Sequence, residues 1–83
     1  MPKRIERTQT GLRLEKSLLK VLKATAEYCD LTLGDLIEGI VLHAFEGKCA
    51  FSSETQAAIA DFKRLYQCDL SAEDSHQLEE NGA

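Results

Sequence analysis

The residues of this chain best suited to chemistry are the cationic side chains of its first quarter. Residues 1–23 carry seven lysines and arginines against two glutamates, a local charge of +5, whereas the remaining residues carry −9. A chain with a net charge of −4 and one basic segment has a polarised field, which attracts polyanions to that segment. The charge pattern therefore predicts a polyanionic partner for Lys3, Arg4, Arg7, Arg13, Lys16, Lys20 and Lys23.

Part of this basic segment alternates with a period of two. Residues 8–14 place threonine and leucine side chains on one face, whereas Arg7, Gln9, Gly11 and Arg13 fall on the other. Such alternation is typical of a two-faced strand. A lone strand leaves backbone groups unpaired on both edges and is not stable by itself. Because no other segment is predicted to be a strand, we expect the same strand of a second copy to pair with it antiparallel about a twofold axis.

Helical periodicity accounts for most of the chain that follows. Apolar stripes predict one helix that begins at Glu15, a second that opens at Thr32 and stops at Gly47, and a third capped by Ser52 or Ser53. After residue 70 the chain is acidic and poor in apolar side chains, which gives no reason to predict regular structure there.

These elements divide the chain into four segments. We expect a basic flexible arm at residues 1–7, a strand-helix-helix domain at residues 8–47, a helical extension at residues 48–70 and an acidic tail at residues 71–83. A chain of 83 residues buries too little apolar surface to be very stable alone, so a homodimer is expected.

Several classes of protein are disfavoured by composition. No apolar run approaches the roughly 20 residues needed to cross a bilayer, and the basic start is not followed by the apolar part of a signal peptide. Cys29, Cys49 and Cys68 are odd in number and far apart, which favours reduced thiols over a disulfide framework or a zinc site. We therefore expect a cytoplasmic protein with no membrane association, metal or cofactor. No nucleophile, base and orienting group are placed together, so an enzyme is not expected either.

The apolar spacings resemble those of a known family. The strand ends in Leu12-Arg13-Leu14, a helix with Leu18, Leu22 and Ala26 follows, and Thr32-Leu33-Gly34-Asp35-Leu36-Ile37 opens the next helix. Over residues 8–46 the chain resembles the ribbon-helix-helix family of DNA-binding dimers. The resemblance implies a mainly α fold, a ribbon-helix-helix homodimer with an intermolecular two-stranded antiparallel ribbon. The chain would add a C-terminal amphipathic helix to it.

The resemblance also implies site residues. In that family the ribbon lies in the major groove of double-stranded DNA, and the matching positions make Gln9 and Arg13, together with Arg7, the base-contacting residues. The chemistry suits this role, because arginine bonds bidentately to guanine and glutamine to adenine.

Phosphate contacts are implied at two other places. The start of the second helix holds a phosphate in that family, which assigns Thr32 and the backbone N–H of Leu33 to this role; a helix N-terminus carries about half a positive charge. Lys3 and Arg4 are able to reach flanking phosphates. The alternatives are that the basic segment at residues 1–7 is simply solvated, and that Thr32 is only a helix cap.

The sequence leaves more than one function open. The first is a sequence-specific DNA-binding repressor whose residues 51–83 extend the dimer or recruit another dimer. The second is an antitoxin-like protein whose C-terminal segment neutralises a toxin, and the third is a bare dimerisation module. Residues 51–83 discriminate between the first two, because a packed segment favours the repressor and a disordered one the antitoxin.

Overall fold

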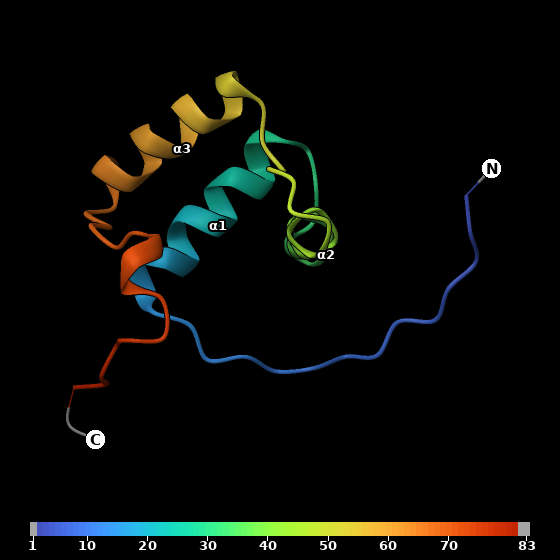
Figure 1. The fold of residues 1–83 in the computed structure, drawn as a ribbon, viewed down its shortest axis with the longest axis horizontal. Helices are drawn as coiled ribbons and strands as arrows, with labels where there is room; N and C mark the ends of the chain where they lie inside the picture. The colour runs from blue at the N-terminus through green and yellow to red at the C-terminus, as the bar shows by residue number, and fades with distance from the viewer. Residues whose placement is uncertain (1, 82–83) are drawn as a thin grey trace.

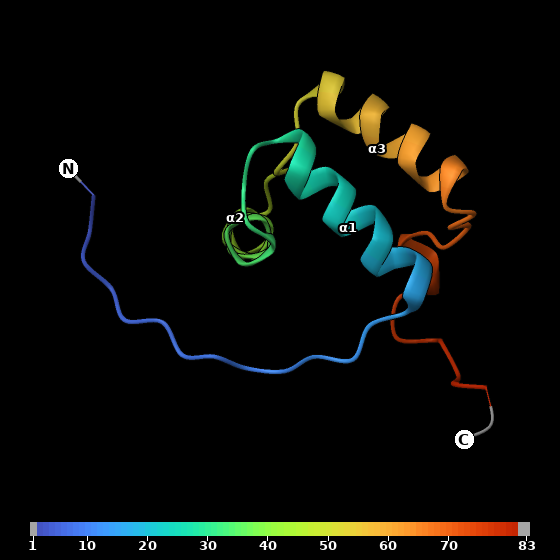
Figure 2. The same cartoon turned by 180° about the vertical axis from the view of Figure 1, so that it is seen from behind.

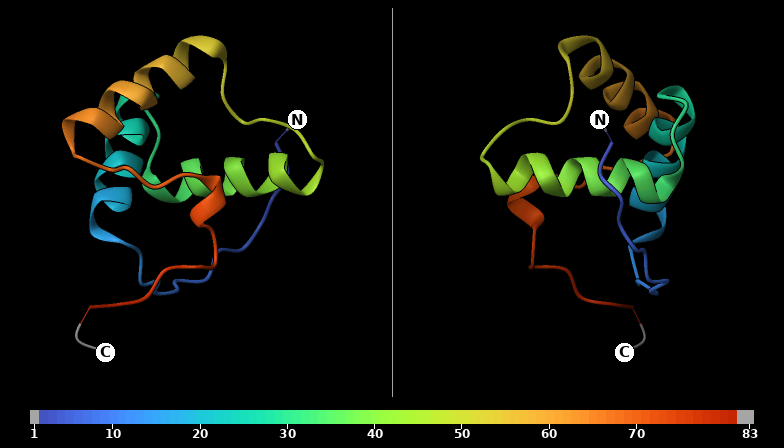
Figure 3. Two further views of the ribbon diagram at one scale, coloured as in Figure 1. Left: turned by 60° about the vertical axis from the view of Figure 1, so that its left-hand side comes forward. Right: turned by 90° about the vertical axis from the view of Figure 1, so that its right-hand side faces the viewer.

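The computed structural model describes residues 2–81, and three helices of equal length form its body (Figure 1). They are α1 (Lys16–Tyr28), α2 (Leu33–Phe45) and α3 (Ser53–Leu65), and a short 3₁₀ helix, η1 (Ala72–Asp74), follows. Helices α1 and α3 lie side by side and run in opposite directions (Figures 1 and 2). Helix α2 is seen end-on in Figure 1 and along its length in Figure 3, so it crosses α1 steeply. Helix α1 is therefore the central element.

Each helix is preceded by a residue whose side chain accepts a hydrogen bond from one or two of the free N–H groups in the first turn. The carboxylate of Glu15 accepts hydrogen bonds from the N–H groups of Ser17 and Leu18. The Thr32 hydroxyl oxygen accepts from the N–H of Asp35 at 3.1 Å, and Ser52 caps α3 in the same way. The predicted cap at Thr32 is confirmed, and Ser52 is the one of the two predicted candidates that caps α3. The first helix begins at Lys16, one residue after the predicted start, and Glu15 is its cap.

Each helix also ends in the same manner. The chain turns through the left-handed region at Asp30 (φ 57°), Gly47 (φ 69°) and Gln67 (φ 54°). In each case the next residue donates a hydrogen bond of 2.8–2.9 Å to the carbonyl five residues earlier, as in a Schellman motif. The turns at Asp30 and Gly47 redirect the chain between the helices so that α2 and α3 both pack on α1, and the turn at Gln67 leads the chain out of α3 toward η1.

The buried core is small and centred on α1. Few residues are buried: Val21, Thr25 and Ala26 of α1, Leu36 of α2, and Cys68. Helix α3 is joined to α1 by Phe62 and Tyr28, whose rings meet edge-on at a centroid distance of 6.1 Å. Beyond α3, the Nζ of Lys63 donates a hydrogen bond of 2.6 Å to the carbonyl of Leu70 and so holds the chain that leads to η1.

The predicted strand at residues 8–14 is wrong, and so is the ribbon-helix-helix fold with its intermolecular ribbon. Residues 2–81 contain no strand or sheet; residues 2–14, here called the arm, form an extended and exposed segment. Alternation indicates only which way side chains point, and no described segment offers a neighbouring edge to the arm backbone. Gly11 weakens the strand tendency further. The prediction of a mainly α fold agrees with the structure.

None of the helices that the structure describes is long and apolar enough to cross a membrane.

Candidate nucleic-acid interface

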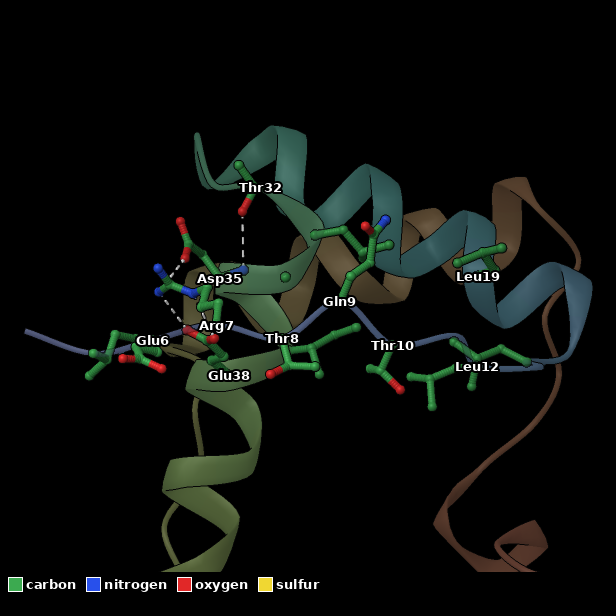
Figure 4. A pocket seen from close by; sticks show the side chains of 15 residues that line it. Glu6, Arg7, Thr8, Gln9, Thr10, Leu12, Leu19, Thr32, Asp35 and Glu38 are labelled. Atoms are coloured by element: carbon green, nitrogen blue, oxygen red, sulfur yellow. Dashed lines mark hydrogen bonds and ion pairs between the residues drawn. The ribbon is translucent and has the colours of Figure 1, made fainter.

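The arm passes the first turns of α2 and leads into the start of α1, and an open hollow lies between it and the two helices (Figure 4). The hollow has a volume of about 850 Å³. Apolar side chains contribute from all three segments, with Leu12 and Leu14 on the arm, Leu19 on α1 and Ile37 on α2. The arm therefore borders the helices loosely, and Leu12 remains 68% exposed.

Arg7 attaches the arm to α2. Its Nε and Nη2 atoms donate to the two carboxylate oxygens of Glu38, both at 2.9 Å, and Nη2 lies 3.4 Å from Oδ1 of Asp35 (Figure 4). The hydrogen bond to Glu38 raises the pKa of Arg7, and the same bond lowers the pKa of Glu38 below its ordinary value. The Arg7 side chain is nevertheless 60% exposed, so solvent weakens the attachment.

The first turn of α2 lies beside the Arg7 contact, because Asp35 belongs to that turn. Thr32 uses its hydroxyl oxygen as an acceptor for the N–H of Asp35, which leaves the hydroxyl proton able to donate to an anion. Within the described residues the N–H groups of Leu33 and Gly34 have no hydrogen-bond partner, as expected for a first helical turn. These groups suit an anion, although the Asp35 carboxylate in the same turn opposes one.

Gln9 and Arg13 lie further along the arm. Gln9 is exposed, and its side chain extends from the arm toward the helices (Figure 4). Arg13 is 85% exposed, and its Nη2 lies 2.6 Å from Oε2 of Glu80 in the C-terminal segment. The three predicted base-contacting residues thus lie on one segment, but their side chains do not all point in the same direction.

Lys3 and Arg4 occupy the exposed start of the arm. The ion pairs found among residues 2–81 include Arg7 and Arg13 but neither Lys3 nor Arg4. The candidate interface therefore combines two cations that are open to solvent with two arginines already held by carboxylates.

Sequence reasoning missed the carboxylates that hold the arginines. Glu38 and Glu80 lie 31 and 67 residues from their partners, too far for any local spacing rule to connect them. The opposite charges of the arm and the tail were the only available signal, and they do not specify a pair.

No group of three His, Cys, Asp or Glu side chains in the described part of the chain is placed to hold a metal ion. No protein-family model matches the chain, and comparisons with curated proteins and with solved structures found no match.

Proposed function

We propose that this protein is a sequence-specific DNA-binding transcriptional regulator, most simply a repressor, and that the arm is its DNA-contacting element. The observation that carries the proposal is an extended segment of exposed residues in which Lys3, Arg4, Arg7 and Arg13 accompany a single acidic residue, Glu6. Cationic side chains that neutralise phosphates provide most of the affinity of such a contact. We place the regulator in the cytoplasm, where its three cysteines stay reduced.

The conformation of the arm supports this role. An extended backbone is narrow enough to enter the major groove of DNA, which is wide enough to admit a helix or a two-stranded ribbon. Gln9 and Arg13 supply the side-chain types that hydrogen-bond adenine and guanine edges. Lys3 and Arg4 supply phosphate contacts, and Thr32 with Leu33 offers a further phosphate site beside the arm.

A homodimer is part of the proposal. Helix α2 exposes Val41, Leu42 and Phe45 by 39%, 63% and 81%, and helical spacing places all three on one face. Large apolar side chains gathered on one exposed face favour association, and closed symmetric dimers are the commonest outcome. Two arms on one dimer would also double the cationic charge presented to DNA.

The packing of the C-terminal half favours a repressor over an antitoxin. Helix α3 lies on α1 through the Phe62–Tyr28 contact, and Cys68 is only 5% exposed. A segment that must wrap around a toxin is expected to be free of its own domain. Residues 53–68 are instead packed against their own chain.

The test begins with selection of duplexes from a random pool, followed by fluorescence anisotropy on the selected sequence and on a scrambled one. Arg13→Gln should keep the fold and lose about 5- to 150-fold of its preference for the selected sequence, which corresponds to one bidentate base contact. Arg64→Gln is the matched control, because Arg64 is an exposed arginine paired with Asp61 on α3. An equal loss in both variants, or no binding of any duplex at low salt, would refute the proposal.

Salt dependence gives a second and independent test. Each phosphate contact contributes a slope of about −0.9 to the plot of log K against log salt concentration. Arg4→Gln should reduce the steepness by roughly one contact per arm, whereas Lys48→Gln, which removes a cation at the far end of α2, should not. A slope that does not respond to Arg4→Gln would exclude the start of the arm from the contact.

A further inference from the structure

The acidic C-terminal segment reaches the arm of its own chain. The contact joins Nη2 of Arg13 to Oε2 of Glu80 at 2.6 Å, across 67 residues of sequence. The end of the arm and the C-terminal segment both lie below the helices in the two views of Figure 3. A side chain suited to contact DNA is therefore occupied by a carboxylate in the free protein.

The structure also holds the start of this segment in place. Cys68 is buried, and Lys63 donates to the carbonyl of Leu70. Ser71 and Asp74 then fix η1, since the N–H of Ser71 donates to Oδ2 of Asp74 at 2.9 Å. Because only a short stretch separates η1 from Glu80, the carboxylate is confined near Arg13 at a high effective concentration.

We propose that residues 71–81 compete with DNA for the arm, with Glu80 as the residue that occupies Arg13 until phosphate or a base edge replaces it. This inference rests on the proposed DNA-binding function and assigns its regulation to the same chain. The segment carries Glu73, Asp74, Glu79 and Glu80 and no lysine or arginine, so it resembles the phosphate backbone in charge. Competition of this kind lowers affinity for every duplex without changing which duplex is preferred.

The expected effect is small, because both partners are exposed. The side chains of Arg13 and Glu80 are 85% and 60% exposed, and exposed ion pairs are weak. Release of such a pair should strengthen DNA binding by about two- to fivefold. General repulsion between the tail and DNA also contributes, and it has to be separated from the specific contact.

The experiment uses the full chain and four variants: Glu80→Gln, Glu79→Gln, Arg13→Gln and the double variant R13Q/E80Q. Glu79→Gln is the matched control, since it removes the same charge from the neighbouring residue, which has no ion pair with the arm in the described chain. Dissociation constants for a selected duplex are measured by fluorescence anisotropy at low salt. We expect Glu80→Gln to bind about two- to fivefold more tightly than wild type and Glu79→Gln to change less.

The double variant tests whether Glu80 acts through Arg13. If it does, Glu80→Gln gains affinity in the wild-type background and gains nothing in the Arg13→Gln background. Equal gains from Glu79→Gln and Glu80→Gln, or a gain that persists without Arg13, would overturn the inference and leave only general repulsion.

A measurement without DNA separates this inference from the proposed function. Backbone amide shifts of residues 76–81 should move in Arg13→Gln and stay unchanged in Arg4→Gln. Unchanged tail shifts in a protein that binds DNA would refute the competition alone. Failure of wild type and all variants to bind any duplex would refute the function and the competition together. Binding that appears only in Glu80→Gln would support both.

Discussion

Leu36 is the one buried residue of α2, with 3% of its surface exposed. Leu36→Ala should therefore weaken the attachment of α2 to α1 more than any other change on that helix. Truncation of a buried leucine to alanine costs about 2–5 kcal/mol, because both transfer energy and packing are lost. A chain of this size has a free energy of unfolding of roughly 4–12 kcal/mol at about 0.05–0.15 kcal/mol per residue. The variant should lose a large share of its stability.

The assay is urea unfolding followed by circular dichroism at several protein concentrations, with Leu42→Ala as the matched control. Leu42 is on the same helix and 63% exposed, so its truncation removes little packing within the chain. We expect Leu36→Ala to lower the midpoint at every concentration. Leu42→Ala should act only through the proposed dimer, so its effect should appear as a change in the concentration dependence of the midpoint.

Two results would refute this reasoning. A loss below about 1 kcal/mol for Leu36→Ala would mean that the site is not part of a packed core, since surface substitutions usually fall within about 0.5 kcal/mol. A concentration-independent loss of several kcal/mol for Leu42→Ala would place that residue inside the fold of one chain.

Three further outcomes follow from individual contacts. Thr32→Ala should cost about 0.5–2 kcal/mol in the free energy of unfolding and Thr32→Ser almost nothing, because only the hydroxyl caps α2; equal losses in urea unfolding would contradict the cap. Gly39→Ala should stabilise the chain by about 1 kcal/mol, since a Cβ at Gly39 would meet no atom within 4 Å beyond its chain neighbours and its own helix backbone; a loss measured in the same way would indicate a close contact there in the proposed dimer. Arg7 lowers the pKa of Glu38, so the Arg7–Glu38 contact should be complete above the ordinary glutamate value of about 4.5 and lost as pH falls through the lowered pKa. Amide shifts of residues 5–9 should follow that transition, and shifts that do not change down to pH 2 would exclude the contact.

The helices could be predicted from sequence because their signals are local. Thr32 and Ser52 cap the N–H groups two or three residues away, and Gly47 ends α2 within one turn. The left-handed turns at Asp30 and Gln67 carry no glycine, so the ends of α1 and α3 were less clearly marked than that of α2. Local rules of this kind need no knowledge of the rest of the chain.

The arm is the segment whose structure the local sequence rules did not predict correctly. A period of two in residues 8–14 is satisfied by any extended backbone, paired or unpaired, because it describes only the directions of side chains. Pairing requires a second edge, and the sequence pattern contains no information on whether one is available. The ion pairs of Arg7 and Arg13 were unpredictable for a related reason, since each joins segments that only the folded chain brings together.

These ion pairs change how the salt dependence of DNA binding should be interpreted. Salt screens the proposed contact between the arm and DNA, and it equally screens the Arg13–Glu80 and Arg7–Glu38 pairs that would compete with DNA. Rising salt therefore releases the arginines while it weakens their attraction to phosphate, and the two effects partly cancel. The slope measured for the wild-type chain should underestimate the number of phosphates contacted, whereas Glu80→Gln should give a steeper slope closer to the actual number. An acidic chain with a basic arm can thus combine strong phosphate contacts with a modest net dependence on salt.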